Sequence, residues 1–105
     1  MLILRIDGTD YRLEKNPSIV YEEVDDECFV YNELTNNICT MNETAKHIFT
    51  CICNNFSRLD AHLNESDIFM SLKNDYLIDD PVNVYVDISE IIKQFIDEQL
   101  FILVQ

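Results

Sequence analysis

The chain has 105 residues, of which 48% are hydrophobic, so it is long enough for one folded domain with a core but too short for two. Twenty acidic residues against seven basic ones give a net charge of −13, which excludes the basic face that nucleic-acid binding requires. The longest apolar runs, such as residues 100–104, are too short to span a membrane, and no secretory signal pattern opens the chain. The sequence therefore predicts a cytoplasmic protein, whose acidity either keeps it soluble or attracts a basic or neutral partner.

The first 17 residues predict a β-hairpin extension. Residues 2–6 and 11–13 flank Asp7-Gly8, a dipeptide suited to a tight turn with positive φ. Asn16-Pro17 then breaks the pattern, so we separate residues 1–17 from a main domain at residues 18–105. The sequence leaves open whether this hairpin extends a sheet, supports a homodimer or shields a strand edge.

Three short strands are expected next. Residues 18–24 and 28–32 form a hairpin around Asp25-Asp26-Glu27, and residues 38–41 form a third strand. The result is a small antiparallel sheet that runs straight into helices, with little room to cover its last strand. Such an uncovered edge is a place where another chain can bind.

The period then changes to that of a helix. Asn42 is a good N-cap and Glu43 suits the positive end of the helix dipole, which predicts a first helix over residues 43–53. Residues 55–63 are expected to be a polar connection. Asn64 caps a second helix, with Asp67 three residues on in a capping-box relation. The expected buried stripe of this helix is Ile68, Phe69, Leu72 and Tyr76.

Asp79-Asp80-Pro81 stops the second helix and turns the chain toward a third one, over residues 83–99. One stripe of this helix consists of Val84, Ile88, Ile91, Phe95 and the stem of Gln99, and an apolar shoulder beside it consists of Tyr85, Ile92 and Ile96. Either the helix packs between two neighbours, or the shoulder lines a groove for a ligand. Residues 100–104 are a closing strand or a packed tail, with residues 2–6 as a candidate partner.

The sequence contains no recognisable pattern of catalytic or metal-binding residues. Neither His47 nor His62 has a second ligand at metal-binding spacing, and a single glycine cannot build a phosphate loop. The four cysteines are expected to be structural and reduced. We therefore expect no catalytic residue, no metal and no cofactor.

The order of these elements resembles the PqqD-like domains, which are the recognition elements of ribosomal peptide biosynthesis. The residues that carry the resemblance are the strand at 38–41, Asn42, and the trio Ala45, Ile48 and Phe49 in the first helix. The similarity extends over residues 18–102, although its motif is short.

The resemblance implies an α+β fold: a winged helix-turn-helix in which a small antiparallel three-stranded sheet is followed by a three-helix bundle, here with the extra N-terminal hairpin. It implies a non-catalytic module that binds the leader peptide of a precursor and delivers it to a modifying enzyme, often a radical-SAM protein. The leader would add as a strand and lie against the third helix. The peptide-binding residues carried over are Asn37, Ile38, Cys39, Thr40, Met41, Tyr85, Ile88, Ile92, Phe95 and Ile96.

One departure from the family pattern lies at the end of the third helix, where Glu98-Gln99-Leu100 replaces the usual glycine. Two other functions are possible for this architecture: a winged-helix transcriptional regulator and a structural protein–protein adaptor. The regulator is disfavoured because the third helix carries Lys93 alone against four acidic residues.

Overall fold

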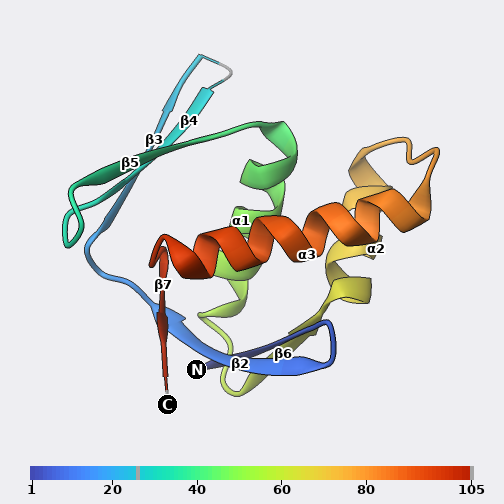
Figure 1. Ribbon diagram of the computed structural model, residues 1–105, viewed down its shortest axis with the longest axis horizontal. Coiled ribbons are helices and arrows are strands. Elements are labelled where there is room, and N and C mark those ends of the chain that lie inside the picture. Colours follow the sequence, from blue (N-terminus) through green and yellow to red (C-terminus); the bar gives the residue numbers. More distant parts are fainter. Residues whose placement is uncertain (26, 105) are drawn as a thin grey trace.

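Two sheets and three helices make up the chain in the computed structural model, which describes residues 1–25 and 27–104 (Figure 1). The expected turn at Asp25-Asp26-Glu27 falls partly on Asp26, outside the described residues. In chain order the elements are β1 (Leu2–Ile6), β2 (Thr9–Lys15), β3 (Ile19–Val24), β4 (Glu27–Asn32), β5 (Asn37–Met41), α1 (Glu43–Asn55), β6 (Ala61–Asn64), α2 (Glu65–Asp75), α3 (Pro81–Asp97) and β7 (Phe101–Leu103). The predicted α+β class is confirmed.

The three-stranded sheet is antiparallel, in the order β3-β4-β5, as predicted. Val20 pairs with Tyr31, and Tyr31 pairs with Ile38, so these side chains form a row across one face. The turn between β4 and β5 ends at Asn36, whose φ of 58° is a left-handed conformation that asparagine tolerates.

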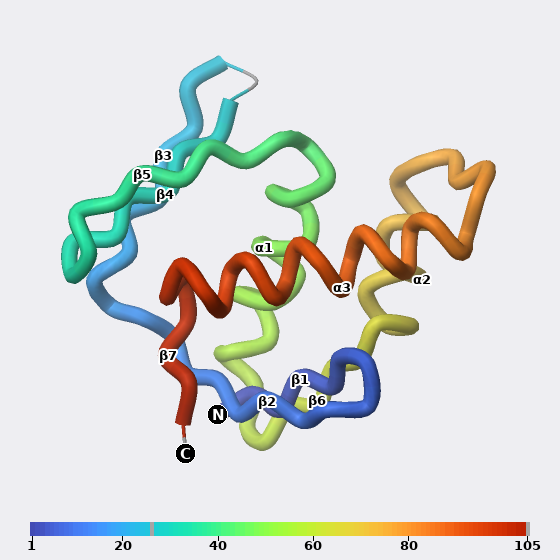
Figure 2. The backbone as a smooth tube through the Cα atoms, in the orientation of Figure 1, coloured from blue at the N-terminus to red at the C-terminus, as the bar shows by residue number. Residues whose placement is uncertain are grey.

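The four-stranded sheet has the order β6-β1-β2-β7 (Figure 2). Asp7 and Gly8 both have positive φ, 50° and 78°, as a two-residue hairpin turn between β1 and β2 requires. The hairpin thus supplies the two central strands of this sheet and does not extend the other one. The boundary after residue 17 remains a prediction, because the hairpin packs into the same core as the rest of the chain.

One expectation about this sheet was wrong, and one pairing that the sequence left open is decided by the structure. The segment expected as a polar connection contains β6, which runs parallel to β1 from the pair Leu2–Ala61 to the pair Arg5–Asn64. The closing strand β7 pairs with β2 and not with residues 2–6, because both edges of β1 are already occupied by β2 and β6.

The first two helices begin at the predicted caps, and the third begins two residues before its expected start. The Asn42 side chain accepts a hydrogen bond from the Ala45 backbone N–H at 2.8 Å. Asn64 and Asp67 form the reciprocal capping box, with distances of 2.9 and 3.0 Å. Asp80 caps α3, whose first residue is Pro81. The first and third helices lie within two residues of their expected bounds.

The core lies where α3 crosses the middle of the molecule, between the two sheets (Figure 1). Phe49 of α1, Phe95 of α3 and Phe101 of β7 pack there with ring centroids 5.5–6.2 Å apart. On α2, Ile68 and Leu72 are buried as predicted, whereas Phe69 and Tyr76 are half-buried.

The turn of the N-terminal hairpin is tied to α3. Ser89 Oγ and Lys93 Nζ each donate a hydrogen bond to Asp7 Oδ2 at 2.6 Å. These bonds, Lys93 foremost, hold the pKa of Asp7 below its usual value. This side of α3 therefore faces the four-stranded sheet. Among residues 1–25 and 27–104, no helix combines the length and the apolar composition that a membrane span requires.

Candidate functional site

The last strand of the three-stranded sheet has an open edge. β5 pairs with β4 along its whole length, from the pair Cys28–Met41 to the pair Asn32–Asn37, and within the described residues no strand pairs with its other side. Alternate residues of an antiparallel edge strand direct their N–H and C=O groups outward, so β5 presents free backbone donors and acceptors. This is the edge that the sequence predicted.

The two faces of β5 differ. Ile38 and Thr40 lie on the outer face, where Ile38 is 68% exposed. Cys39 and Met41 lie on the inner face, where Met41 belongs to the core and Cys39 is half-buried. Burial, with the Glu98 carboxylate beside the sulfur, raises the pKa of the Cys39 thiol to about 12. The inner face of this edge therefore meets the end of α3 at Glu98.

The end of α3 has the geometry of a Schellman motif, although no glycine is present. The Leu100 N–H donates to the Phe95 carbonyl and the Gln99 N–H to the Ile96 carbonyl, each at 3.0 Å, while Gln99 adopts a φ of 59°. Gln99 thus takes the left-handed position that glycine usually holds in this motif, and the helix ends in the same way without a glycine.

Two buried asparagines fix this helix end against both sheets. Asn32 Nδ2 of β4 donates to the carbonyls of Glu98 and Gln99, at 3.2 and 3.1 Å. Asn16 Nδ2, from the segment between the sheets, donates to the Gln99 carbonyl at 2.8 Å. These bonds satisfy carbonyls that a helix terminus otherwise leaves unpaired, and they hold α3 next to the start of β5.

The predicted helix side of the site is largely in the core. Ile88 and Ile92 have no exposed surface and Phe95 has 2%, so their side chains do not face a groove. Gln99 lies beyond the helix end at Asp97 and takes no part in the stripe. The expectation that the apolar shoulder lines a groove is therefore corrected for Ile92: the wide arc arises because α3 packs between two neighbours.

The other two shoulder residues face away from β5. The ring of Tyr85 stacks on Phe69 of α2 with centroids 4.7 Å apart, and Ile96 packs against the core on the side of Ser89 and Lys93. At about 100° per residue, the side of α3 that carries Glu98 instead carries Ile91 and Gln94. The sequence prediction did not include these three residues, because helical spacing defines an apolar arc but not the direction of the nearest strand.

Glu98 is the most distinctive polar group at this edge. Its Oε2 atom is buried and the Cys39 thiol lies beside the carboxylate, while Oε1 accepts a hydrogen bond from Gln94 Nε2 at 3.4 Å. The residue as a whole is only half-buried, so its carboxylate attracts an incoming N–H or cationic group. Asp87, Glu90 and Asp97 add negative charge along the same helix. This edge of the molecule thus favours a basic partner.

A serine–histidine–aspartate trio lies elsewhere, between α1 and α2. His47 Nε2 is 2.9 Å from Ser71 Oγ, and His47 Nδ1 is 3.4 Å from Asp75 Oδ2. Ser71 lies inside α2, where backbone N–H groups donate to helical carbonyls and are not free to form an oxyanion hole. The trio therefore acts as a polar link between two helices. In the described part of the chain, no group of three or more potential ligands is placed to hold a metal ion.

The fold is similar to two solved structures of leader-peptide complexes. One is TbiB1 in complex with the TbiA(beta) leader peptide, with a TM-score of 0.65 and 14% identity over 84% of this chain and 93% of that one. The other is lasso peptide synthetase B1 complexed with the leader peptide, with a TM-score of 0.65 and 15% identity over 88% of this chain and 96% of that one. No protein-family model and no curated protein matches the chain. At such low identity, the likeness establishes a shared fold.

Proposed function

We propose that the chain is a leader-peptide binding module. A segment of the leader adds as a strand to the open edge of β5 and lies between that edge and the C-terminal half of α3. The observation that carries the proposal is the free edge of β5 beside α3, in a fold shared with two proteins whose structures hold leader peptides.

Backbone hydrogen bonds to residues 37–41 would supply affinity that does not depend on the leader sequence. Selectivity would come from Cys39 on the strand and from Ile91, Gln94 and Glu98 on the helix. The half-buried Glu98 carboxylate favours a leader with an N–H group, lysine or arginine at that point. Ile88, Ile92 and Phe95 would act indirectly, because from the core they hold α3 at its distance from β5.

The winged helix-turn-helix description belongs to this proposal, with the three-stranded sheet as the wing and α2 and α3 as the helical pair. The regulator alternative is not favoured. The one basic residue of α3, Lys93, is already paired with Asp7, so this helix offers phosphate no free cation. A fixed structural adaptor would use the same edge and differs only in the partner that fills it.

The module acts without catalysis and delivers its precursor to a separate modifying enzyme, for which a radical-SAM protein is one candidate. A cytoplasmic location and a homodimer remain predictions from the sequence. We place the partner enzyme outside the β5 edge, since that edge is taken by the leader.

Titration of the isotope-labelled protein with a synthetic peptide tests the proposal. We expect a short precursor gene beside this one, and the peptide is the leader region that it encodes. We expect micromolar or tighter binding, with the largest amide chemical-shift changes at residues 37–41 and at Ile91, Gln94 and Glu98. Shift changes that avoid both elements would contradict the proposal.

A matched pair of variants sharpens the test. Glu98→Gln should weaken binding at least about fivefold, or ~1 kcal/mol, because a neutral amide replaces the carboxylate that receives the leader donor. Asp97→Asn removes the same charge from an exposed position one residue earlier and should change the affinity less than about twofold.

A further inference from the structure

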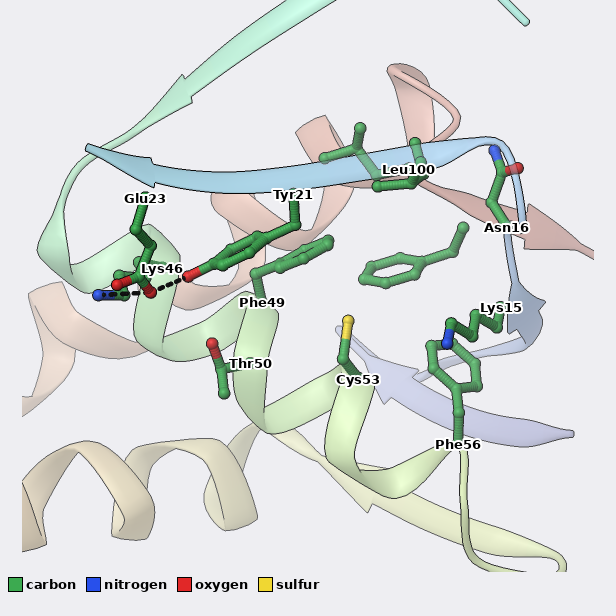
Figure 3. Close-up of a pocket in the computed structure, with 12 residues that line it drawn as sticks. Lys15, Asn16, Tyr21, Glu23, Lys46, Phe49, Thr50, Cys53, Phe56 and Leu100 are labelled. Carbon is green, nitrogen blue, oxygen red and sulfur yellow. Dashed lines mark hydrogen bonds and ion pairs between the residues drawn. The ribbon is translucent and has the colours of Figure 1, made fainter. Parts of the chain in front are cut away.

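A cavity of about 520 Å³ lies on the opposite side of the three-stranded sheet from the β5 edge, between β3 and α1 (Figure 3). Its walls are mainly apolar: Ile19 and Tyr21 from β3, Phe49 and Cys53 from α1, and Phe56, Leu100 and Phe101. The rings of Tyr21 and Phe49 stack in parallel with centroids 6.0 Å apart, and the Cys53 sulfur points into the space between them and Phe56 (Figure 3). A cavity of this size can hold an aromatic side chain.

The strand above the cavity is the second open edge of the sheet. β3 pairs with β4 on one side, and within the described residues no strand pairs with its other side. All residues of β3 after Ile19 are exposed. Ile19, Tyr21 and Glu23 alternate along the strand and point to the cavity face. A strand added to this edge would therefore direct every second side chain over the cavity.

Charge around the cavity differs from that of the whole chain. Of the seven basic residues in a chain of net charge −13, two line this space, Lys15 at one end and Lys46 at the other. Lys46 Nζ is held by Glu23 at 2.9 Å, and the Tyr21 hydroxyl also donates to Glu23. Lys15 makes no ion pair within residues 1–25 and 27–104.

The positive charge of Lys15 affects the Cys53 thiol in the cavity wall. Burial raises the pKa of the Cys53 thiol to about 11, and the nearby Lys15 ammonium opposes that rise. The cavity thus combines an apolar interior with an unpaired cation at one end, which complements an apolar group that has a carboxylate close by.

We propose that the β3 edge and this cavity bind an extended segment of a partner polypeptide, with an aromatic side chain in the cavity and an acidic residue two positions away, next to Lys15. The two-residue spacing follows because only alternate side chains of a strand face the same side. The sheet would then hold two different chains on its two edges: a basic leader at β5 and an acidic segment at β3. The proposed site at β3 does not depend on leader binding at β5.

The probe is the capped pentapeptide acetyl-Glu-Thr-Phe-Thr-Glu-amide, which places an acidic residue two positions from the phenylalanine in either strand direction. We expect binding below about 1 mM, with amide shift changes along β3 and the first two turns of α1. Versions with alanine in place of phenylalanine, or with lysines in place of both glutamates, should bind at least about tenfold more weakly.

Protein variants separate this site from the leader site. Lys15→Glu should weaken the pentapeptide about tenfold, whereas Lys73→Glu, the same charge change at an exposed position of α2, should change it less than about twofold. Neither variant should alter leader binding at β5. Circular dichroism and thermal unfolding check that Lys15→Glu keeps the fold.

Three outcomes would overturn the inference. One is the absence of shift changes at β3 up to millimolar peptide. Another is saturation of the cavity by decanoate while the peptide has no effect, which would make it a site for a small amphiphile. The third is self-association through β3 without any peptide, which would assign the edge to a second copy of the chain.

Discussion

β1 in the four-stranded sheet buries Leu2, Leu4 and Ile6 completely, whereas β3 in the three-stranded sheet leaves every residue from 20 to 24 exposed. The first sheet is completed by strands from distant parts of the chain and closes the core. The second is a simple meander in which no strand of the described chain pairs with either outer edge. The difference separates the part of the molecule that stabilises the fold from the part that is available for binding.

The largest effect should come from a pair of truncations, one in each sheet. Leu4→Ala removes a side chain with no exposed surface and should lower the free energy of unfolding by about 2–5 kcal/mol. Ile38→Ala removes a side chain that is 68% exposed and should change it by less than about 0.5 kcal/mol. Urea denaturation followed by circular dichroism measures both. Equal losses would break the division between a stabilising sheet and a binding sheet.

A smaller effect of opposite sign is expected at the helix end that joins the two sheets. Gln99 holds a φ of 59°, so Gln99→Gly should relieve backbone strain and raise the free energy of unfolding by about 0.5–1 kcal/mol. Its carbonyl, which both Asn16 and Asn32 contact, is kept. As a control, Gln94→Gly inside α3 should lower stability by about 0.5–1 kcal/mol. A loss of stability at position 99 would show that the exposed glutamine side chain matters more than the strain.

The smallest effect is a dependence on pH at the contact between the hairpin turn and α3. The pKa of Asp7 is lower in the folded protein than its ordinary value of 3.8, because Lys93 and Ser89 donate to it. Such a carboxylate stabilises the fold above its unfolded pKa, and this contribution disappears as the pH falls through the lowered folded pKa.

The stability difference between wild type and Asp7→Asn should therefore be constant near neutral pH and shrink in acid below pH 3.8. Urea denaturation at a series of pH values measures it. Asparagine tolerates the positive φ of this turn, so the variant isolates the charge. Parallel profiles down to the acid limit would mean that Asp7 contributes no charge-dependent stability.

Much of the fold could be predicted from local pattern. Local signals within a few residues are carried by Asp7-Gly8, by the alternation in β3 to β5 and by the caps Asn42 and Asn64. β6 could not be found this way, because it has only Ala61 and Leu63 as inward residues in a polar stretch. Its partner β1 lies almost 60 residues earlier, and a long-range parallel pairing leaves no local signal.

The candidate site, like the fold, could be predicted only in part from the sequence. The open edge at residues 37–41 followed from the order of elements, and the structure has it. The residues of α3 that lie near β5 could not be predicted from the order of elements. The buried Ile88 and Ile92 and the half-buried Ile91 are all apolar, and only packing against α1, α2 and the hairpin decides which of them remains near β5.

The pairing of β2 with β7 has a consequence for the order of folding. Residues 13–15 are synthesised early, but their partners at residues 101–103 come almost 90 residues later. Closing such a long loop is slow, so we expect the four-stranded sheet to be completed as a late, long-range step, after the local hairpins and helices have formed. Until then the hairpin has one unpaired edge along β2, and the growing chain depends on a rapid final closure to escape association with its neighbours.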